Sequence, residues 1–419
     1  MPNRILNNFC ATMFLVLMAS FFWGHAVVNI ALGILLLGHL SMLIKNWRSK
    51  KPRFDIMLLP ILAYFGLFVL SRIIDTNQQA AINTVERSIY YPLILITLWL
   101  GIRTYTQKQI DRALFAYVFS NIVSSIFLIA TAVHKTWIYG SVNPFNVANG
   151  NHFSYHAFTE VLNFHAVYYG LFTITSIGIL LDFILRKKTY GREWLFVIAI
   201  AYLSVITLLL SSFMLVIILA GIYLCYLIFK LQQKRNLWSW RPLNILVLVC
   251  SLIVLGFGSI FIVEKSKGLS LHEDFKVENI SGEEFTAVRA RVMKAYSSWQ
   301  LIKQKPIEGY GTGNSQIALR QSYLEHGFQH GYEENYNSHN QYLTTTLHFG
   351  VIGLFILLLY ILIVATALRQ LPFLTSIFLI TCLLIFFSES ILERQHGVLW
   401  FAFFSGFVYF RAKQHYNHV

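Results

Sequence analysis

Charged residues are scarce in this 419-residue sequence: Asp, Glu, Lys and Arg together make up only 12% of it. Soluble domains usually carry about 25%. Hydrophobic residues account for 56% of the chain and aromatic residues for 16%, and the mean hydropathy is +0.57. This composition excludes an ordinary soluble globular protein and a protein dominated by disordered tails.

Cysteine is also scarce. Cys10, Cys225, Cys250 and Cys382 each lie within an apolar run, and none has the pair spacing of a zinc site. We therefore interpret them as buried thiols. The first apolar run follows a single basic residue, Arg4, and lacks a small-residue cleavage site, so we expect a retained first helix rather than a cleaved signal peptide.

Acidic residues are few beside basic ones, which leaves a net charge of +14. In a soluble protein this excess would suggest nucleic-acid binding, whereas in a membrane protein it suggests basic cytoplasmic loops. Twelve apolar segments are candidates to span a membrane. They lie at about 8–23, 26–44, 54–71, 84–102, 113–133, 166–185, 193–210, 212–230, 243–263, 341–367, 373–389 and 395–411.

The distribution of Lys and Arg predicts the orientation of these segments. If the N-terminus is cytoplasmic, most basic residues fall in inside loops, which points to the membrane and not to nucleic acid as the partner. The charge alternates correctly only if Ser211–Ser212 is an outside turn. Otherwise residues 193–230 form one long helix.

The predicted fold is an all-α polytopic membrane protein with about twelve spans and cytoplasmic termini. We divide it into spans at 1–263, an outside loop domain at 264–340 and three final spans at 341–419. A second outside loop covers 134–165. The domain at 264–340 holds 10 of the 19 acidic and 9 of the 33 basic residues. Its predicted helix, about 283–304, repeats apolar residues at helical spacing. They are Val288, Val292, Ala295, Trp299 and Ile302.

His339 and Asn340 stand where this loop domain meets the tenth span. An imidazole can take a proton from a hydroxyl near neutral pH, and Asn340 can orient it or contact a sugar. The alternative is a helix N-cap made by Ser338 or Asn340, with His339 incidental.

Arg289 and Arg291 lie two residues apart on the predicted loop helix, so they do not share a face. One of them can point into a site, where arginine suits a phosphate or pyrophosphate. The alternative is a solvated pair matched by Glu283 and Glu284.

Alternating glycines at Gly309, Gly311 and Gly313 suit a tight turn with close backbone approach. The motif lacks the Lys-Ser/Thr ending of a nucleotide P-loop, so we reject nucleotide binding. A purely structural turn is the alternative.

Several charged residues lie at the outer edge of predicted spans, where charge is costly. They are Glu86, Arg87, Glu389, Glu393 and Arg394. Ion pairs between helices and a functional site are both open explanations.

The outside loop at 134–165 is rich in Tyr, His and Asn, and it ends at His165, shortly before Tyr168. Such side chains suit sugars, although an interfacial aromatic belt is the alternative. A zinc site from His152, His156 and His165 is conceivable, but no cysteine or carboxylate pattern supports it.

Together these residues resemble the bacterial O-antigen ligase and polymerase superfamily of lipid-linked-glycan transferases. The resemblance covers most of the chain and is most specific in three places. The first runs from Arg289 or Arg291 through Pro306 and the glycine turn to His339-Asn340, and then to Gly350 and Gly353. The second is Glu86-Arg87 followed by Pro92. The third is Glu389 through Glu393-Arg394-Gln395.

The resemblance implies an inverting glycosyl transfer on the periplasmic face of the bacterial inner membrane, with no cofactor and no protein-bound metal. The donor would be a glycan on undecaprenyl pyrophosphate, and the acceptor a sugar hydroxyl of lipid A-core. His339 would be the general base. Arg289 or Arg291 would hold the pyrophosphate with Arg87, while His165 and nearby tyrosines would line the sugar groove.

One departure from the family concerns the turn after the seventh span, where Phe213 takes the place of an arginine that serves the pyrophosphate. Either Arg87 or Arg394 would substitute, or this member handles its donor differently. We favour a ligase over a polymerase or a protein O-oligosaccharyltransferase. A twelve-span transporter is a further alternative, but transporters place polar residues at mid-membrane and have two similar halves.

Overall fold

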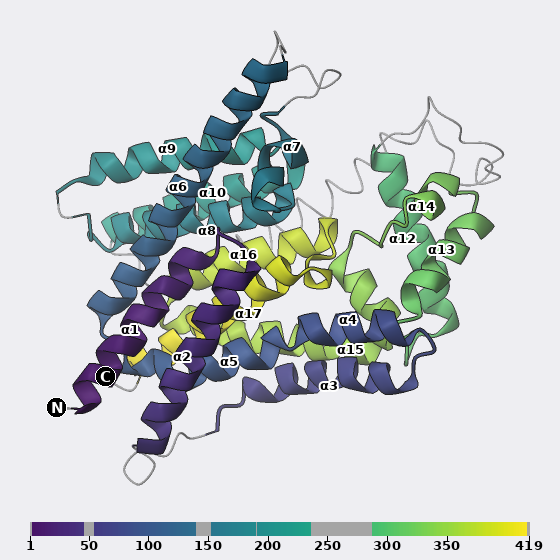
Figure 1. Cartoon of the computed structure of the whole chain (residues 1–419), viewed down its shortest axis with the longest axis horizontal. Helices are drawn as coiled ribbons and strands as arrows, with labels where there is room; N and C mark the ends of the chain where they lie inside the picture. The colour runs from purple at the N-terminus through teal and green to yellow at the C-terminus, as the bar shows by residue number, and fades with distance from the viewer. Residues whose placement is uncertain (1, 46–53, 140–151, 190, 236–286, 417–419) are drawn as a thin grey trace.

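The computed structural model describes residues 2–45, 54–139, 152–189, 191–235 and 287–416. Regular structure in these ranges is helical, which confirms the all-α class (Figure 1). The long helices are α1 (Pro2–Ser20), α2 (His25–Lys45), α3 (Leu58–Ile74), α6 (Gln107–Tyr139), α8 (Ala166–Leu185), α9 (Glu193–Leu209), α10 (Phe213–Arg235), α12 (Ala287–Gln304), α15 (Gln341–Ala365), α16 (Pro372–Ser388) and α17 (Gln395–Tyr416). The shorter ones are α4 (Gln78–Ser88), α5 (Tyr90–Gly101), α7 (Tyr155–Thr159), α13 (Ser315–Glu325) and α14 (Gln329–Glu333).

The helices identify a multi-pass membrane protein. Six described stretches are long and apolar enough to cross a membrane: His25–Lys45, Gln78–Thr104, Gln107–Ile138, Ala166–Leu185, Phe213–Gln233 and Gln341–Arg369. Four further apolar helices are shorter: Arg4–Ser20, Leu58–Ile74, Glu193–Leu209 and Pro372–Ser388. The twelve-span count stays a prediction, and its ninth segment, 243–263, lies outside the described residues.

The apolar run at 193–230 forms two helices. α9 ends at Leu209 and α10 begins at Phe213, and between them Ser211 adopts a φ of +51°. Both helices contact α8. The alternative of one long helix is therefore wrong, and the turn required by the charge alternation is present.

α8 lies at the centre of the bundle and is almost entirely buried. It contacts α6, α9, α10, α16 and α17. A Cβ atom added to Gly170 would lie 2.1 Å from Leu215 Cδ1, and one added to Gly178 would lie 2.9 Å from Ile377 Cδ1. Small residues at these positions allow the neighbouring helices to approach closely.

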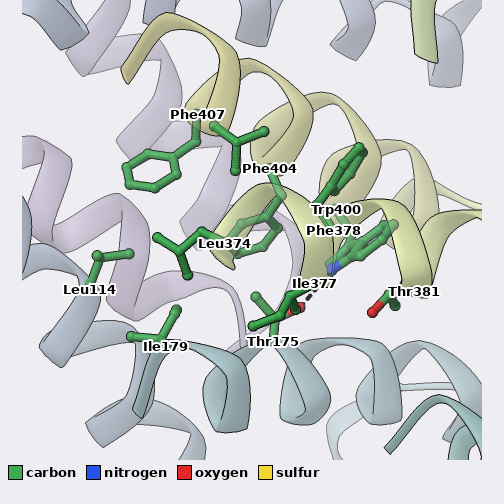
Figure 2. Close-up of a pocket in the computed structure, with 11 residues that line it drawn as sticks. Leu114, Thr175, Ile179, Leu374, Ile377, Phe378, Thr381, Trp400, Phe404 and Phe407 are labelled. Carbon is green, nitrogen blue, oxygen red and sulfur yellow. Dashed lines mark hydrogen bonds between the residues drawn. The ribbon is translucent and has the colours of Figure 1, made fainter. Parts of the chain in front are cut away.

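Aromatic and aliphatic side chains from α6, α8, α16 and α17 line a small pocket in the bundle (Figure 2). Trp400 stacks on Phe378 with ring centroids 5.4 Å apart, and its indole N–H donates to Thr175 Oγ1 over 2.9 Å. This core holds together the helices whose ends carry the candidate site, because His165 precedes α8 and Glu389 follows α16.

A smaller core joins α12, α13 and α14 to the first turns of α15, at the right of Figure 1. It consists of Ala290, Met293, Leu301, Ile302, Leu319, Tyr323, Phe328 and Leu347. The predicted apolar face of α12 is wrong in part: Trp299 is 54% exposed and Ala295 is exposed, whereas Lys294 is buried. The reason is that α12 packs against α13 and α15 through a neighbouring face that includes small and polar side chains.

α15 is broken at Gly350, where φ is +62° and ψ is −162°. The break frees backbone groups, and the glycine turn satisfies them. The N–H groups of Tyr310 and Gly311 donate to the carbonyls of Leu347 and His348 over 2.7 and 2.9 Å, and Val351 N–H donates to the Pro306 carbonyl. Such compensation is needed wherever a membrane helix is interrupted. The turn at 306–311 is thus part of the α15 kink.

Candidate active site

The segment before α15 brings His339 to Glu389, which follows α16. His339 Nδ1 lies 3.3 Å from Glu389 Oε2. Because Nδ1–H faces the carboxylate, Nε2 is left as the basic nitrogen of the ring. The pair therefore has the arrangement of a general base and the carboxylate that orients it. The sequence left open whether Glu389 or Glu393 assists His339, and the contact favours Glu389.

His339 is held in an unusual backbone conformation, with a φ of +46°. Asn337 Oδ1 accepts its backbone N–H over 3.0 Å. Asn340 caps α15, since its Oδ1 accepts the Leu343 N–H over 3.0 Å. The capping alternative is thus confirmed for Asn340. His339 is nevertheless not incidental to the cap, because its ring points to a carboxylate from another helix.

Hydroxyl groups fasten the His339 segment to the turn after α16. Ser338 Oγ lies 2.6 Å from Thr344 Oγ1, which lies 2.7 Å from Ser390 Oγ. The Leu392 N–H donates to Gln341 Oε1 over 2.7 Å. These buried contacts fix the position of Glu389 relative to His339.

Glu389 is held as a carboxylate. Burial alone would raise its pKa, but the hydrogen bond and electrostatic attraction of His339, with the positive charge of Arg291, outweigh this and lower the pKa below its ordinary value. An ionised Glu389 keeps the proton of His339 on Nδ1.

Glu393 has different partners. Its Oε2 accepts a hydrogen bond from Asn337 Nδ2, and its Oε1 lies 3.8 Å from His348 Nε2. Arg87 Nη1 donates to the Glu393 backbone carbonyl. Burial raises the pKa of Glu393 despite Asn337 and Arg87. Glu393 thus supports the segment that carries His339, at one wall of a narrow pocket that Arg87, His348 and Gln341 also line.

The predicted arginines differ in their surroundings. Arg291 on α12 and Arg394 before α17 are both exposed. The charge of Arg291 reaches Glu389, where it helps to lower the pKa, and Tyr155, where it opposes the rise in pKa caused by burial. Glu86 is exposed on α4. Arg289 lies in α12, and its side chain is outside the described residues.

Lys294 was not predicted from the sequence. It lies one turn after Arg291 on α12 and is 6% exposed. Its ammonium sits 3.8 Å from the ring centroid of Tyr336. Burial lowers its pKa to about 8, although the charge of Glu389 opposes this shift. The i, i+3 spacing from Arg291 was the available signal, but a lysine inside a packed face is visible only in the fold.

His165 forms a wall together with Tyr155 and His156, and this wall lies beside the His339–Glu389 pair. The His156 and His165 rings have centroids 3.9 Å apart, and the buried His165 Nδ1 atom has no hydrogen-bond partner among the described residues. Burial and the neighbouring His156 lower the pKa of His165 to about 4, so the ring is neutral at pH 7. Tyr168 is buried behind it, with ring centroids 5.4 Å apart.

The predicted glycines lie against α3 and α4. Gly313 N–H donates to Asp75 Oδ2 over 2.6 Å, and a Cβ on Gly311 would lie 1.8 Å from Asp75 Oδ1. Thr312 Oγ1 accepts a hydrogen bond from Thr84. The glycines therefore allow the loop domain to dock on Asp75. Their predicted contact with a substrate stays a prediction.

No group of three or more His, Cys, Asp or Glu side chains suited to a metal ion occurs among the residues that the structure describes. His156 and His165 lie together, but the zinc-site alternative gains no third ligand from the described part of the chain.

A family model described as O-Antigen ligase matches residues 194–358. This match supports the O-antigen ligase and polymerase superfamily, as the motifs predicted. The family suggests a ligase or polymerase of the glycosyltransferase kind, with glycan and lipid-linked substrates in a membrane. No curated protein matches the chain. The matched segment contains Arg291, Lys294 and His339, and the fold adds Glu389 and Arg87 from outside it.

Proposed function

We propose that the protein is an O-antigen ligase-type glycosyltransferase. It moves a glycan from undecaprenyl pyrophosphate to a sugar hydroxyl of lipid A-core at the periplasmic face of the inner membrane. The observation that carries this proposal is the His339–Glu389 pair, which lies beside the cations of α12 and the wall made by His165 and Tyr155.

The chemistry requires one proton transfer and one displacement. His339 Nε2 accepts the proton of the acceptor hydroxyl as its oxygen attacks the anomeric carbon of the donor sugar. The bond between that carbon and the pyrophosphate oxygen breaks, and undecaprenyl pyrophosphate leaves. Attack from the opposite face inverts the anomeric configuration. Glu389 stabilises the imidazolium that forms.

Cations must offset the charge on the leaving pyrophosphate. Arg291 is the exposed cation whose charge reaches Glu389, and Lys294 lies one turn further along the same helix. Arg289, Arg87 and Arg394 complete the proposed set. Phe213 is an exposed side chain at the start of α10 and occupies the position where an arginine is expected, so this position supplies no cation.

Glu86, Asn340, His165, Tyr168, Gly311, Gly313 and Glu393 complete the proposed substrate-binding set. Of these, His165 forms a surface beside the pair, whereas Tyr168 and Glu393 act through the side chains that they support. A ring wall suits the apolar faces of a sugar.

A lipopolysaccharide gel of a deletion strain tests the reaction. A ligase leaves bare lipid A-core and accumulates lipid-linked polymer. Core that carries one repeat unit would instead show a polymerase, and normal ladders with loss of glycoprotein staining would show a protein acceptor. Complementation with the wild-type gene is the control.

A further inference from the structure

A large groove lies between α6, α8 and α9, far from the candidate active site. It has a cavity volume of about 1170 Å³, slightly above the roughly 300–1000 Å³ of a typical small-molecule site. His165 lies at the start of α8, and the groove lining on this helix begins at Leu180, so about 22 Å of helix separate the two.

The mouth of the groove is basic. Lys108 and Arg112 lie in the first turns of α6, Lys188 follows α8, and Arg192 precedes α9. All four are exposed. Among the described residues, no carboxylate forms an ion pair with any of them.

The acidic residue in the lining is already neutralised. Asp111 forms an ion pair with Arg186 at 2.9 Å and accepts a hydrogen bond from Gln107 over 2.7 Å. The Asp111–Arg186 pair also ties the start of α6 to the end of α8. The four cations are therefore free to meet an anion from outside the chain.

The walls beyond the mouth are apolar. They include Phe115, Phe119 and Ile122 of α6, Phe183 of α8, and Leu195 and Ala199 of α9. From Lys108 to Ile122 the groove follows α6 for about 21 Å. One leaflet of a bilayer has a hydrocarbon layer of about 15 Å with a headgroup above it.

We propose that this groove binds an anionic glycerophospholipid, with its phosphate between the four cations and an acyl chain along the apolar wall. Charge complementarity selects an anionic headgroup over a zwitterionic one. The length of the groove selects a lipid that spans one leaflet over a long polyprenyl chain. The cations also place this end at the cytoplasmic leaflet, where anionic lipids concentrate. The proposal does not depend on the glycosyl transfer.

The test uses the full chain, purified in neutral detergent and exposed to phosphatidylglycerol or phosphatidylcholine. Native mass spectrometry measures the lipid that stays bound. We expect phosphatidylglycerol to be retained in preference to phosphatidylcholine. The combined variant Lys108→Gln, Arg112→Gln, Lys188→Gln, Arg192→Gln should reduce its retention by at least about tenfold.

A second combined variant is the matched control. Lys45→Gln, Lys187→Gln, Lys230→Gln, Arg369→Gln removes the same charge from exposed cations at helix ends that do not line the groove. It should change retention by less than about twofold. Equal losses in the two variants would show that only the general surface charge matters, and would overturn the proposal.

A second pair of variants tests the apolar wall. Ala199→Phe fills the groove, whereas Ala201→Phe places the same ring on an exposed position of α9 outside it. Only the first should expel the lipid. Equal retention of both lipids by the wild type, or displacement of phosphatidylglycerol by equimolar undecaprenyl phosphate, would also overturn the proposal.

Discussion

At the scale of single residues, the candidate site depends on one contact between distant parts of the chain. His339 and Glu389 are 50 positions apart in the sequence, and their side chains meet at 3.3 Å. The histidine is suited to accept a proton only because the carboxylate fixes which ring nitrogen carries the hydrogen. Each of the following residue changes alters one part of this arrangement.

His339→Ala should leave the protein folded and abolish most glycan transfer, since a general base contributes about 10²- to 10⁴-fold. The measurement is transfer by reconstituted protein from a lipid-linked donor to purified core. His134→Ala, which removes an exposed histidine of α6, is the control. Full activity of His339→Ala would refute the general-base role.

Glu389→Gln and Glu393→Gln should separate the two carboxylates. Loss of the Glu389 charge leaves the imidazolium unsupported, so we expect at least about a tenfold fall in kcat. Glu393 contacts Asn337 and not His339, so Glu393→Gln should lower thermal stability more than kcat. The reverse order would assign the supporting carboxylate to Glu393.

The lowered pKa of Lys294 predicts how kcat/KM falls at alkaline pH. Its pKa is lowered to about 8 by burial, so it carries a positive charge below that pH and loses it above. We expect kcat/KM to fall as the pH rises through about 8, because an uncharged amine no longer attracts the pyrophosphate. Lys294→Arg should move the fall to higher pH, and Lys303→Met, which removes an exposed lysine of the same helix, should leave it in place.

Arg291→Ala should lower transfer much more than Arg289→Ala, because residues two apart on a helix face different directions. The kinetic readout is KM for the lipid-linked donor. Equal and mild losses would support a solvated pair and remove both arginines from the site.

At the scale of elements, the interruption of α15 explains why Gly309 and Gly350 are needed, because their backbones meet. The turn at 306–311 inserts its backbone against the kink at Gly350, and a Cβ on Gly350 would lie only 1.9 Å from the Ile307 carbonyl oxygen. Backbone approaches this close exclude any side chain. Gly309 is therefore explained by the approach of the turn to α15, whereas Gly311 and Gly313 are explained by their contact with Asp75 after α3.

Gly350→Ala should destabilise the protein by about 2 kcal/mol or more, since it combines a positive φ with a backbone clash. Thermal unfolding of the two proteins in detergent measures this loss of stability. A Cβ atom added to Gly66 on α3 would have no neighbouring atom within 4 Å, so Gly66→Ala should be neutral or slightly stabilising. Similar stabilities for the two variants would contradict the packing at the kink.

At the scale of the whole molecule, the basic groove mouth and the candidate site lie at opposite ends of α8. The basic groove mouth lies at one end of α8 and His165 at the other. The orientation that this implies can be tested on the intact cell envelope. A membrane-impermeant thiol reagent applied to spheroplasts should label Asn335→Cys, in the loop before α15, and should not label Lys187→Cys, near the groove.

The three native cysteines that the structure describes are buried, which keeps the background of this labelling low. After membrane disruption both introduced cysteines should react, which serves as the control for exposure. The opposite pattern in intact spheroplasts would invert the predicted topology.

The sequence by itself determined the elements that depend on local hydropathy. α8 occupies 166–185 as predicted, and α9 and α10 separate at Ser211–Ser212. It also singled out His339, Glu389 and Arg291, because polar groups at the edge of an apolar span are costly and stand out. These properties can be read along the chain without knowledge of its neighbours.

Only the tertiary structure decided which of these groups meet. It paired His339 with Glu389 rather than Glu393, buried Lys294 against Tyr336, and set Gly311 and Gly313 against Asp75. It also turned α12 so that Trp299 faces outward. The physical reason is that burial, and with it pKa and contact, is set by the helices that pack on a residue, and hydropathy along the chain carries no record of them.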